Sequence, residues 1–262
     1  MPEEPEWLPK SEFLTFEELE RVARLFIQRL GIDSIRLTGG EPLVRRGVPD
    51  FVARLDALRG LGLRRISMTS NGVPLARSAA ALAAAGLDDI NISIDSLDPE
   101  RFRRMTGGGD LAAVLEGIRA ARDAGLGLKL NAVVIRGDNE DDVVPSPNGP
   151  WARGSPSLHR FITQCPWRLA AQRVVPEREI IEHLEQRHEV EPVSRTREPA
   201  TYYRVDGAYH LGVISTVSNP FCSTCDRVRV TATGEIYPCL FSPVNTDLKT
   251  PLRDGADDDE LE

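Results

Sequence analysis

The sequence predicts an α/β fold in which short parallel strands alternate with helices. Apolar runs of strand length recur along residues 1–143, and a helical pattern that commonly ends at a glycine separates each run from the next. Polar or glycine-containing turns follow the strands, as expected where parallel strands end. The expected strands are 34–38, 65–69, 90–94 and 128–135, and the expected helices are 15–30, 49–59, 76–85 and 111–124.

The first helix has clear start and end signals. Thr15 can cap its amino end, and Glu18 three residues later completes a capping box. Gly31 suits the left-handed residue that ends many helices. The run 34–38 is then expected to form a short buried strand, and the two glycines that follow it allow a ligand to approach the backbone closely.

Polar side chains recur on or just after the four predicted strands. A single one is explained well enough as a strand-end cap or turn residue, but repetition on four units favours a pocket lined by these side chains. They are Arg36, Gly39, Gly40 and Glu41 after the first strand, Thr69 and Asn71 after the second, Ser93 and Asp95 after the third, and Lys129 and Asn131 on the fourth.

The overall composition is that of a water-soluble globular protein. The chain has 262 residues, of which 41% are hydrophobic and 27% charged. We expect no transmembrane span, no signal peptide and a cytoplasmic location, since clustered cysteines in a long chain are typical of metal binding in a reducing compartment. The formal net charge of −8 argues against nucleic acid as a partner.

The middle of the chain departs from the alternating pattern. Residues 144–172 are rich in proline and have no clear period, so we expect an aberrant, irregular segment there. A regular pattern returns with a helix that begins at Pro176 and runs to about Arg187, followed by strands at 202–205 and 210–217. The sequence thus divides into regions 1–143, 144–172 and 173–262.

Three of the four cysteines gather near the end of the chain. Cys222 and Cys225 form a C-x2-C pair, and Cys239 follows after a hairpin that turns at 232–234. Arg227 and Arg229 are expected on one side of the outgoing strand, where they could bind an anionic ligand. Three thiolates suit an iron–sulfur cluster with an open coordination position. A zinc ribbon or a redox pair, with Cys165 as a distant fourth ligand, stays open.

Five stretches together resemble a known enzyme family. They are IRLTGGEPLVRR (35–46), TSNG (69–72), NISIDSLDPERF (91–102), LKLNAVVIRG (128–137) and FCSTCDRVRVTATGEIYPCLF (221–241). In combination they resemble the GTP 3′,8-cyclases of molybdenum cofactor biosynthesis, lyases of the radical S-adenosylmethionine superfamily. The resemblance covers residues 1–143 and 173–262.

The resemblance implies an incomplete (βα) barrel with a cysteine-bearing hairpin extension. In the family one [4Fe–4S] cluster binds S-adenosylmethionine and cleaves it to a radical, a second [4Fe–4S] cluster binds GTP, and the enzyme is a homodimer. By motif, Cys222, Cys225 and Cys239 would hold the C-terminal cluster. The GTP-binding residues would be Arg36, Thr69, Lys129, Arg227, Val228 and Arg229, and those that contact S-adenosylmethionine would be Gly40 and Ser93.

The sequence departs from the family pattern in three places. The C-x3-C-x2-C motif of the first cluster is absent before Cys165, so this chain is expected not to ligate that cluster or form the radical. Either a misplaced start or a true loss would explain this. Residues 144–172 resemble the product of a frame disturbance, and Cys165 stands where the family has a methionine. The family's final glycines do not follow residue 262. A non-catalytic iron–sulfur nucleotide-binding protein and a zinc-stabilised binding module are therefore alternatives.

Overall fold

The computed structural model describes residues 8–143, 158–163, 171–193, 198–207, 209–216 and 218–261. They belong to two compact units, each assembled from stretches that are distant in sequence. Unit 1 comprises the described residues within 1–69, 81–88 and 226–262, and unit 2 those within 70–80 and 89–225. The consecutive regions expected from the sequence remain a prediction. No helix of the described residues is long and apolar enough to cross a membrane.

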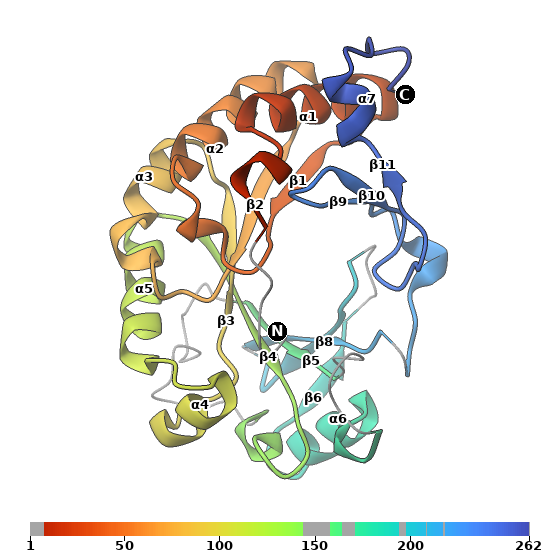
Figure 1. Cartoon of the computed structure of the whole chain (residues 1–262). Helices are drawn as coiled ribbons and strands as arrows, with labels where there is room; N and C mark the ends of the chain where they lie inside the picture. Colours follow the sequence, from red (N-terminus) through yellow and green to blue (C-terminus); the bar gives the residue numbers. More distant parts are fainter. Residues whose placement is uncertain are drawn as a thin grey trace. The chain divides into compact units, whose positions relative to one another are not determined.

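Unit 1 combines a parallel strand pair with a small antiparallel sheet. Strands β1 and β2 pair in parallel from Ser34 opposite Arg65 to Leu37 opposite Met68, and β9, β10 and β11 pair antiparallel. Helices α1 and α2 lie side by side (Figure 1). The elements are α1 (Phe16–Leu30), β1 (Ser34–Leu37), α2 (Val48–Asp56), β2 (Arg65–Ser70), β9 (Arg229–Val230), β10 (Glu235–Tyr237), β11 (Thr246–Asp247) and α7 (Lys249–Arg253), while α3 (Ala79–Ala84) spans the boundary of the two units.

The predicted ends of the first helix are confirmed. The Thr15 hydroxyl accepts a hydrogen bond from the Glu18 backbone N–H at 3.1 Å, and the Thr15 N–H donates to the Glu18 carboxylate at 2.7 Å. Gly31 ends the helix with φ of 68°. The following strand is in place but the expectation that it is buried is wrong, since its residues alternate between exposed and half-buried. A polar residue at every second position leaves β1 only one apolar face.

One hydrophobic core joins the two ends of unit 1. Leu14 and three residues of α1 pack with Leu248 and Leu252 of the C-terminal segment, and all six are buried. Backbone bonds reinforce this packing, since the Leu14 N–H donates to the Ala232 carbonyl at 2.8 Å and the Leu248 N–H donates to the Gly234 carbonyl at 2.8 Å. The hairpin that carries Arg229 is therefore held by residues from both ends of the sequence.

Unit 2 is built on a mixed sheet with strand order β3-β4-β5-β8-β7-β6. The strands from β3 to β8 in that order are parallel, and β7 and β6 continue the sheet antiparallel. The strands are β3 (Asp89–Ser93), β4 (Gly127–Val133), β5 (Leu158–Ile162), β6 (Val190–Pro192), β7 (Thr201–Val205) and β8 (Tyr209–Ile214), and the helices are α4 (Pro99–Thr106), α5 (Leu111–Asp123) and α6 (Glu177–Glu185).

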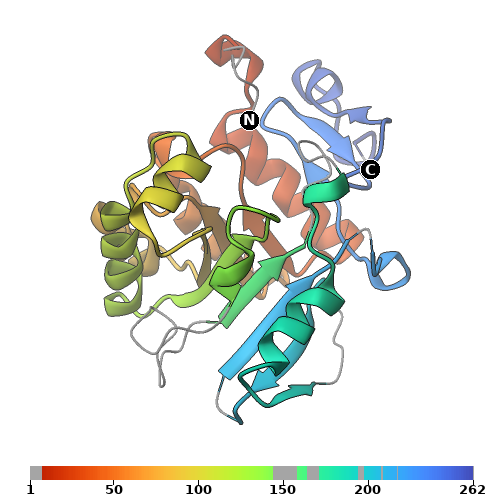
Figure 2. The same cartoon turned by 90° about the horizontal axis from the view of Figure 1, so that it is seen from below.

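Helix α6 covers one face of this sheet. Ile180 and Leu184 pack against buried apolar residues of β5, β7 and β8, and α6 lies along these strands in Figure 2. On α5, Gly117 is required by a close approach, because a Cβ there would lie 2.2 Å from the Gly72 carbonyl oxygen. The contact holds the turn after β2 against α5. The α/β fold with parallel strands and intervening helices predicted from the sequence is confirmed.

The expectation that 144–172 is irregular is wrong for the strand β5. Residues 158–162 pair in parallel with both β4 and β8, in the interior of the sheet. Arg160 and Phe161 are both buried, with 3% and 8% of their surface exposed. A strand covered on both faces has no alternation of polar and apolar residues, so its sequence carries no strand period. Cys165 lies outside the described residues.

Candidate functional site

A row of residues crosses the sheet of unit 2 from β3 to β7. Strand pairing sets Ser93 opposite Asn131, Asn131 opposite Arg160, Arg160 opposite Gly212, and Gly212 opposite Tyr202. Paired residues on neighbouring strands face the same side of a sheet, so these five residues share one face, here called the sheet row. The sequence predicted only Ser93 and Asn131 among them.

The sheet row continues into a network of charged groups. Lys129 precedes Asn131 by two residues on β4 and therefore faces the same side. Its ammonium lies 3.3 Å from the Glu198 carboxylate, which also accepts a hydrogen bond from the Tyr202 hydroxyl. The Arg160 Nε donates to the Asn131 side-chain oxygen at 3.0 Å. Lys129 thus lies within β4 and not at its end, which corrects the expected strand-end position.

Gly212 provides the space that the sheet row needs. A Cβ on this residue would lie 2.9 Å from the Tyr202 ring, 3.0 Å from Arg160 Cγ and 3.2 Å from Ala200 Cβ. The two long side chains meet over β8 because residue 212 has no side chain of its own. The absence of a side chain on this central strand therefore positions Arg160 and Tyr202.

The electrostatics of the network follow from burial and from close charges. Burial lowers the pKa of the Arg160 guanidinium, and Tyr202 and Glu198 oppose this effect. Burial would raise the pKa of Glu198, but the Tyr202 hydroxyl, Lys129 and Arg160 outweigh it and hold that pKa below its ordinary value. Burial and the Glu198 carboxylate both raise the pKa of Tyr202. Glu198 is therefore ionised at neutral pH, and Tyr202 keeps its proton and donates.

Two further predicted residues lie at the end of β3. Ser93 is exposed, which suits a residue that contacts a ligand. Asp95 is half-buried, and its carboxylate accepts a hydrogen bond from the Val133 N–H at 2.9 Å. Burial raises the pKa of Asp95 above its ordinary value, and the hydrogen bond only partly offsets it. Asn139 donates to the backbone carbonyls of Asp95 and Val133, so Asp95 also joins β3 to the segment after β4.

In unit 1, Arg36 and Thr69 share one face of the parallel pair. Arg36 is paired with Ser67, and its Nε donates to the Ser67 hydroxyl at 3.1 Å. Thr69 follows Ser67 by two residues on β2 and is half-buried. A guanidinium and a hydroxyl on one strand-end face match the donors that phosphate oxygens accept.

The turn after β1 leaves its backbone open. Gly39 has φ of 149°, a conformation that other residues rarely adopt, and a Cβ on Gly39 or Gly40 would meet no atom within 4 Å. The Glu41 carboxylate accepts a hydrogen bond from the Leu43 N–H at 3.1 Å and so closes the turn. The backbone at Gly40 therefore has room for a ligand, and its contact with S-adenosylmethionine stays a prediction.

The predicted hairpin of the C-terminal region is confirmed, but its strands are short. Gly234 forms the turn with φ of 85° between β9 and β10. Because β9 begins at Arg229, Arg227 precedes the strand, and the expectation that both arginines lie on it is wrong. Arg227 and Arg229 are half-buried, whereas Val228 between them is 38% exposed.

The three predicted cluster ligands are exposed cysteines that form no disulfide among the described residues. Cys222 and Cys225 share one 3₁₀ turn in unit 2, and Cys239 belongs to unit 1, where its sulfur accepts a hydrogen bond from the Phe241 N–H at 3.4 Å. Within the described part of the chain, no three His, Cys, Asp or Glu side chains already form a metal site. Exposed thiols and a backbone N–H directed at sulfur fit the donor chemistry of an iron–sulfur cluster. Because the three thiols do not already form a site, the ligand set stays a prediction.

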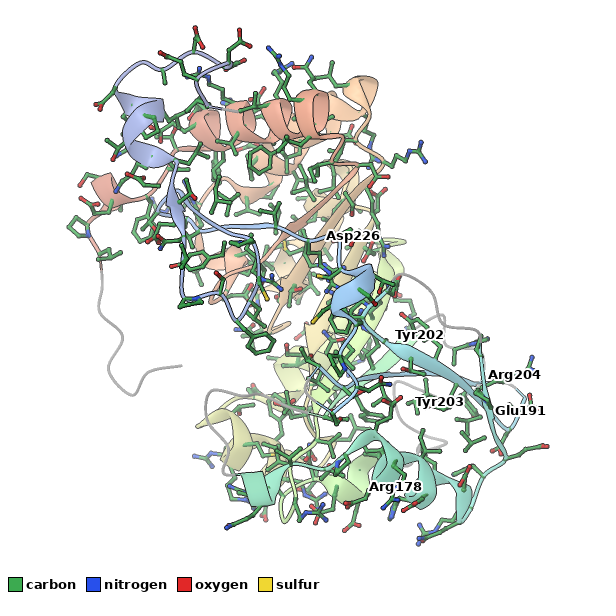
Figure 3. All side chains as sticks on the ribbon, turned by 90° about the vertical axis from the view of Figure 1, so that its right-hand side faces the viewer. Arg178, Glu191, Tyr202, Tyr203, Arg204 and Asp226 are labelled. Atoms are coloured by element: carbon green, nitrogen blue, oxygen red, sulfur yellow. The ribbon has the colours of Figure 1, made fainter. Side chains whose placement is uncertain are left out.

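Sequence reasoning missed Arg160, Glu198 and Tyr202. Arg160 falls in the segment expected to be irregular, although an arginine inside an apolar strand is the same signal that identified Arg36. The sequence predicts that Tyr202 lies on a strand, but no local signal indicates which strand pairs with it. Tyr202 and Tyr203 are neighbours on β7 (Figure 3) and therefore point to opposite faces of the sheet.

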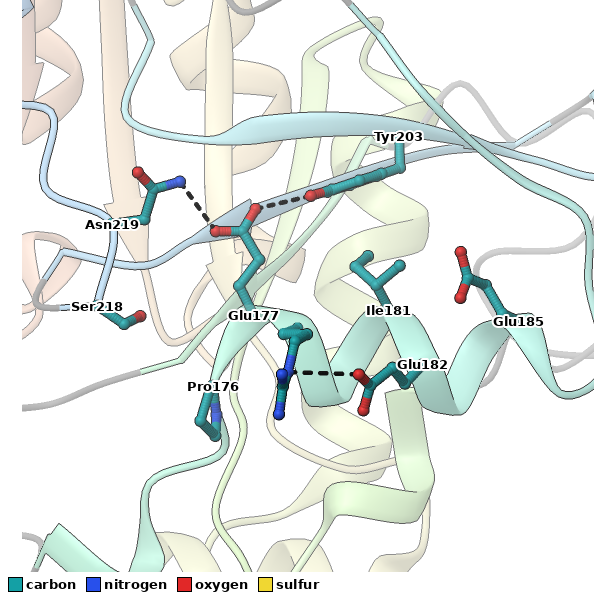
Figure 4. Close-up of a pocket in the computed structure, with 9 residues that line it drawn as sticks. Pro176, Glu177, Ile181, Glu182, Glu185, Tyr203, Ser218 and Asn219 are labelled. Carbon is teal, nitrogen blue, oxygen red and sulfur yellow. Dashed lines mark hydrogen bonds and ion pairs between the residues drawn. The ribbon is translucent and has the colours of Figure 1, made fainter.

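Tyr203 lines a separate pocket of about 540 Å³ beside α6. Figure 4 shows the Glu177 carboxylate directed at Tyr203 and Asn219, whose side chains donate to it at 2.9 and 3.3 Å. Glu182 and Glu185 also line it, and Arg178, which pairs with Glu182 at 3.3 Å, is the one basic residue among the described residues of its lining. An acidic lining repels phosphate, so this pocket does not resemble a nucleotide site.

In a comparison with known proteins, one family model matches the N-terminal part of the chain and another matches the C-terminal part. The model of the Radical SAM superfamily matches residues 3–146, and the model of Molybdenum Cofactor Synthesis C matches residues 160–262. The chain is 38% identical to the GTP 3′,8-cyclase of Paracoccus denitrificans over 276 residues, which cover 100% of this chain and 77% of that protein. It is 41% identical to the GTP 3′,8-cyclase of Streptomyces coelicolor over 273 residues, which cover 100% of this chain and 78% of that protein.

A solved structure supports the fold. The crystal structure of Streptococcus suis SuiB bound to S-adenosylmethionine aligns with a TM-score of 0.59 at 13% identity. The alignment covers 99% of this chain, which spans only 61% of SuiB. At this identity the likeness shows the α/β fold alone. The two matched models and the relatives along the whole sequence show more: this chain is a member of the GTP 3′,8-cyclase family of the radical S-adenosylmethionine superfamily.

Proposed function

We propose that this protein functions in molybdenum cofactor biosynthesis, in the radical cyclisation of GTP, and that the described residues supply its GTP-binding part. The observation that carries this proposal is the similarity to GTP 3′,8-cyclases along 98–100% of the chain. The cationic side chains of Arg36 on β1 and Lys129 on β4 support it, because triphosphate recognition needs several charge-assisted hydrogen bonds.

Each of the two units contains residues that are proposed to bind GTP. Arg36, Thr69 and the segment 227–229 come from unit 1, and Lys129 comes from unit 2. Arg160, which shares a face with Lys129, is a further candidate because its guanidinium can form paired hydrogen bonds with phosphate oxygens. In this proposal the arginines and the lysine bind and orient the triphosphate, and Val228 contributes apolar contact.

The proposed cofactors are a [4Fe–4S] cluster on Cys222, Cys225 and Cys239, and S-adenosylmethionine near Gly40 and Ser93. In the family, S-adenosylmethionine is the source of the radical that removes a hydrogen atom from GTP, and the C-terminal cluster would bind GTP. The residues of this chain hold the cluster through thiolate sulfur, and the open backbone at Gly40 admits S-adenosylmethionine. The cluster that cleaves S-adenosylmethionine needs a C-x3-C-x2-C motif, which these 262 residues do not contain.

Iron and sulfide analysis after anaerobic reconstitution tests the cluster. One C-terminal cluster predicts about four irons and about four sulfides per chain. The Cys239→Ser variant is the matched comparison and is expected to lose most of both, because a cluster held by two thiolates is labile. Stoichiometric zinc without sulfide would instead support the zinc-stabilised module and contradict this proposal.

We also propose a homodimer in the cytoplasm, without nucleic acid or membrane as a partner. The family resemblance supports the dimer, and the net charge of −8 disfavours binding to a polyanion. Light scattering on the reconstituted protein measures the mass in solution. A particle of one chain would contradict the proposed dimer.

A further inference from the structure

The strongest unexplained feature of unit 2 is a carboxylate placed among cations that are expected to bind an anion. Lys129 and Arg160 are little exposed, with 13% of the lysine side chain and 3% of the arginine residue accessible. A guanidinium buried this deeply needs a negative partner, since an uncompensated buried charge is strongly destabilising. Glu198 contacts Lys129 at 3.3 Å, and Glu198 and Asp89 both oppose the lowering of the Arg160 pKa by burial.

Glu198 lies where the anionic group of a ligand could take its place beside the cations. Its side chain is 36% exposed, far more than either cation, and it precedes β7 instead of lying on a strand. It is held from the side by the Tyr202 hydroxyl, which donates to one oxygen while Lys129 contacts the other at 3.3 Å. The carboxylate therefore contacts Lys129 from a position that is more exposed than that of either cation, while both cations lie on strands of the sheet.

A phosphate group and this carboxylate compete for the same donors. The carboxylate is planar and the phosphate is tetrahedral, but both present oxygen acceptors that bind ammonium and guanidinium groups through charge-assisted hydrogen bonds. Two anions within a few ångströms of each other repel strongly in a partly buried site. A phosphate that contacts Lys129 and Arg160 thus requires Glu198 to move away or to lose its charge.

We propose that Glu198 is an internal counter-ion for Lys129 and Arg160, which a phosphate group of the nucleotide displaces on binding. The proposal rests on the proposed function, because it assigns GTP to this face of unit 2. In the ligand-free protein Glu198 keeps the two cations compensated and in place. Breaking this contact costs part of the free energy of nucleotide binding. The carboxylate therefore weakens binding of phosphate-bearing ligands and leaves binding of an uncharged nucleoside unaffected.

Calorimetric titration of GTP and of guanosine into the cluster-reconstituted chain tests this. The Glu198→Gln variant is expected to bind GTP about tenfold more tightly, the effect of one charged hydrogen bond of ordinary strength, while guanosine binds as in the unchanged protein. Glu191→Gln is the matched control. Glu191 is an exposed carboxylate of the same unit, paired with Arg204 at 2.7 Å, and the two lie together away from Tyr202 (Figure 3). Its removal is expected to leave GTP affinity unchanged.

A second variant keeps the test decisive if Glu198→Gln does not fold without a counter-ion for Arg160. Tyr202→Phe retains the carboxylate but removes the hydroxyl that orders it, so GTP binding is expected to tighten by about threefold, the lower end for a neutral hydrogen bond. GTP should also raise the melting temperature of Glu198→Gln more than that of the unchanged protein, because the triphosphate then supplies the missing negative charge.

The outcomes separate this proposal from the proposed function. If the unchanged protein binds GTP, and Arg229→Ala abolishes that binding, then equal or weaker binding by both Glu198→Gln and Tyr202→Phe overturns the counter-ion role alone. If the unchanged protein does not bind GTP, the proposed function fails and the counter-ion role fails with it. Tighter GTP binding accompanied by equally tighter guanosine binding also contradicts a role directed at phosphate.

Discussion

The sheet row of unit 2 and the C-terminal hairpin of unit 1 hold their candidate ligand-binding groups in opposite ways. In and beside the sheet row, Arg160 is buried and donates to the Asn131 amide oxygen, and the half-buried Lys129 is paired with Glu198. In the hairpin, the two-residue strand β9 carries the half-buried Arg229, and Cys239 is exposed next to the exposed apolar residues Leu240 and Phe241. One region pairs its cations within the sheet, whereas the other exposes its thiols.

The difference shows two ways to prepare an anion site. Sheet strands fix side chains before the ligand arrives, which lowers the ordering cost of binding, but buried cations then need a substitute anion. A short hairpin needs no such substitute, because water solvates its exposed groups. Its geometry instead depends on the core that anchors it and, in the proposed function, on the cluster. The two regions should therefore respond differently to loss of packing, of space and of charge.

Loss of packing should have the largest effect, and it should fall on the hairpin. Leu248 is 3% exposed in the core that joins α1 to the C-terminal segment, and its N–H bonds to the turn of the hairpin. Leu248→Ala is expected to lower the free energy of unfolding by about 2–5 kcal/mol, as for other large-to-small core changes. Denaturant titration measures this. Val244→Ala, at a residue that is 68% exposed, is the control and should change little.

Leu248→Ala should also loosen the hairpin more than the sheet of unit 2. Hydrogen exchange is expected to speed up at the amides of β9 and β10 in Leu248→Ala, while the amides of β4 and β5 stay protected under native conditions. Equal loss of protection in both regions would show that the hairpin is not anchored by this core in particular.

Removal of space should disturb the sheet row, with a smaller cost. Gly212→Ala places a Cβ within 3.2 Å of atoms of Tyr202, Arg160 and Ala200, so at least one long side chain must move. We expect a loss of about 1–3 kcal/mol in the free energy of unfolding, typical of overpacking, and weaker GTP binding because Arg160 is displaced. Gly60→Ala is the control, since its Cβ meets no atom within 4 Å. Unchanged GTP affinity in Gly212→Ala would contradict a role for the sheet row in binding.

These two regions also differ in how far the sequence revealed them. The hairpin was predictable because its signals are local: C-x2-C spacing, alternating valines and Gly234 in the turn. Lys129 and Asn131 were found because they interrupt an apolar strand. Arg160 and Tyr202 were not connected, since their meeting depends on β5 and β7 flanking β8, which is a long-range pairing without a local signal. Likewise, no local pattern predicts that Glu198 reaches Lys129.

The smallest effect concerns charge, at the end of β3. Burial raises the pKa of Asp95, so the folded protein binds this proton more readily than the unfolded chain does. Its ionisation therefore costs stability at neutral pH, and this cost disappears as the pH falls through the raised pKa of the folded state to the unfolded value of about 3.9. Asp95→Asn removes the charge and keeps an oxygen that can accept from the Val133 N–H.

Thermal unfolding of both proteins between pH 7 and pH 4 measures this effect. The melting temperature of Asp95→Asn relative to the unchanged protein should be highest at pH 7 and should decline steadily on acidification, because only the unchanged protein gains stability from the bound proton. Other titrating groups are common to both proteins and cancel in the difference. A difference that is constant with pH, or that grows as the pH falls, would show that Asp95 is not held against ionisation. The end of β3 would then tolerate a charge at this position as readily as the exposed hairpin does.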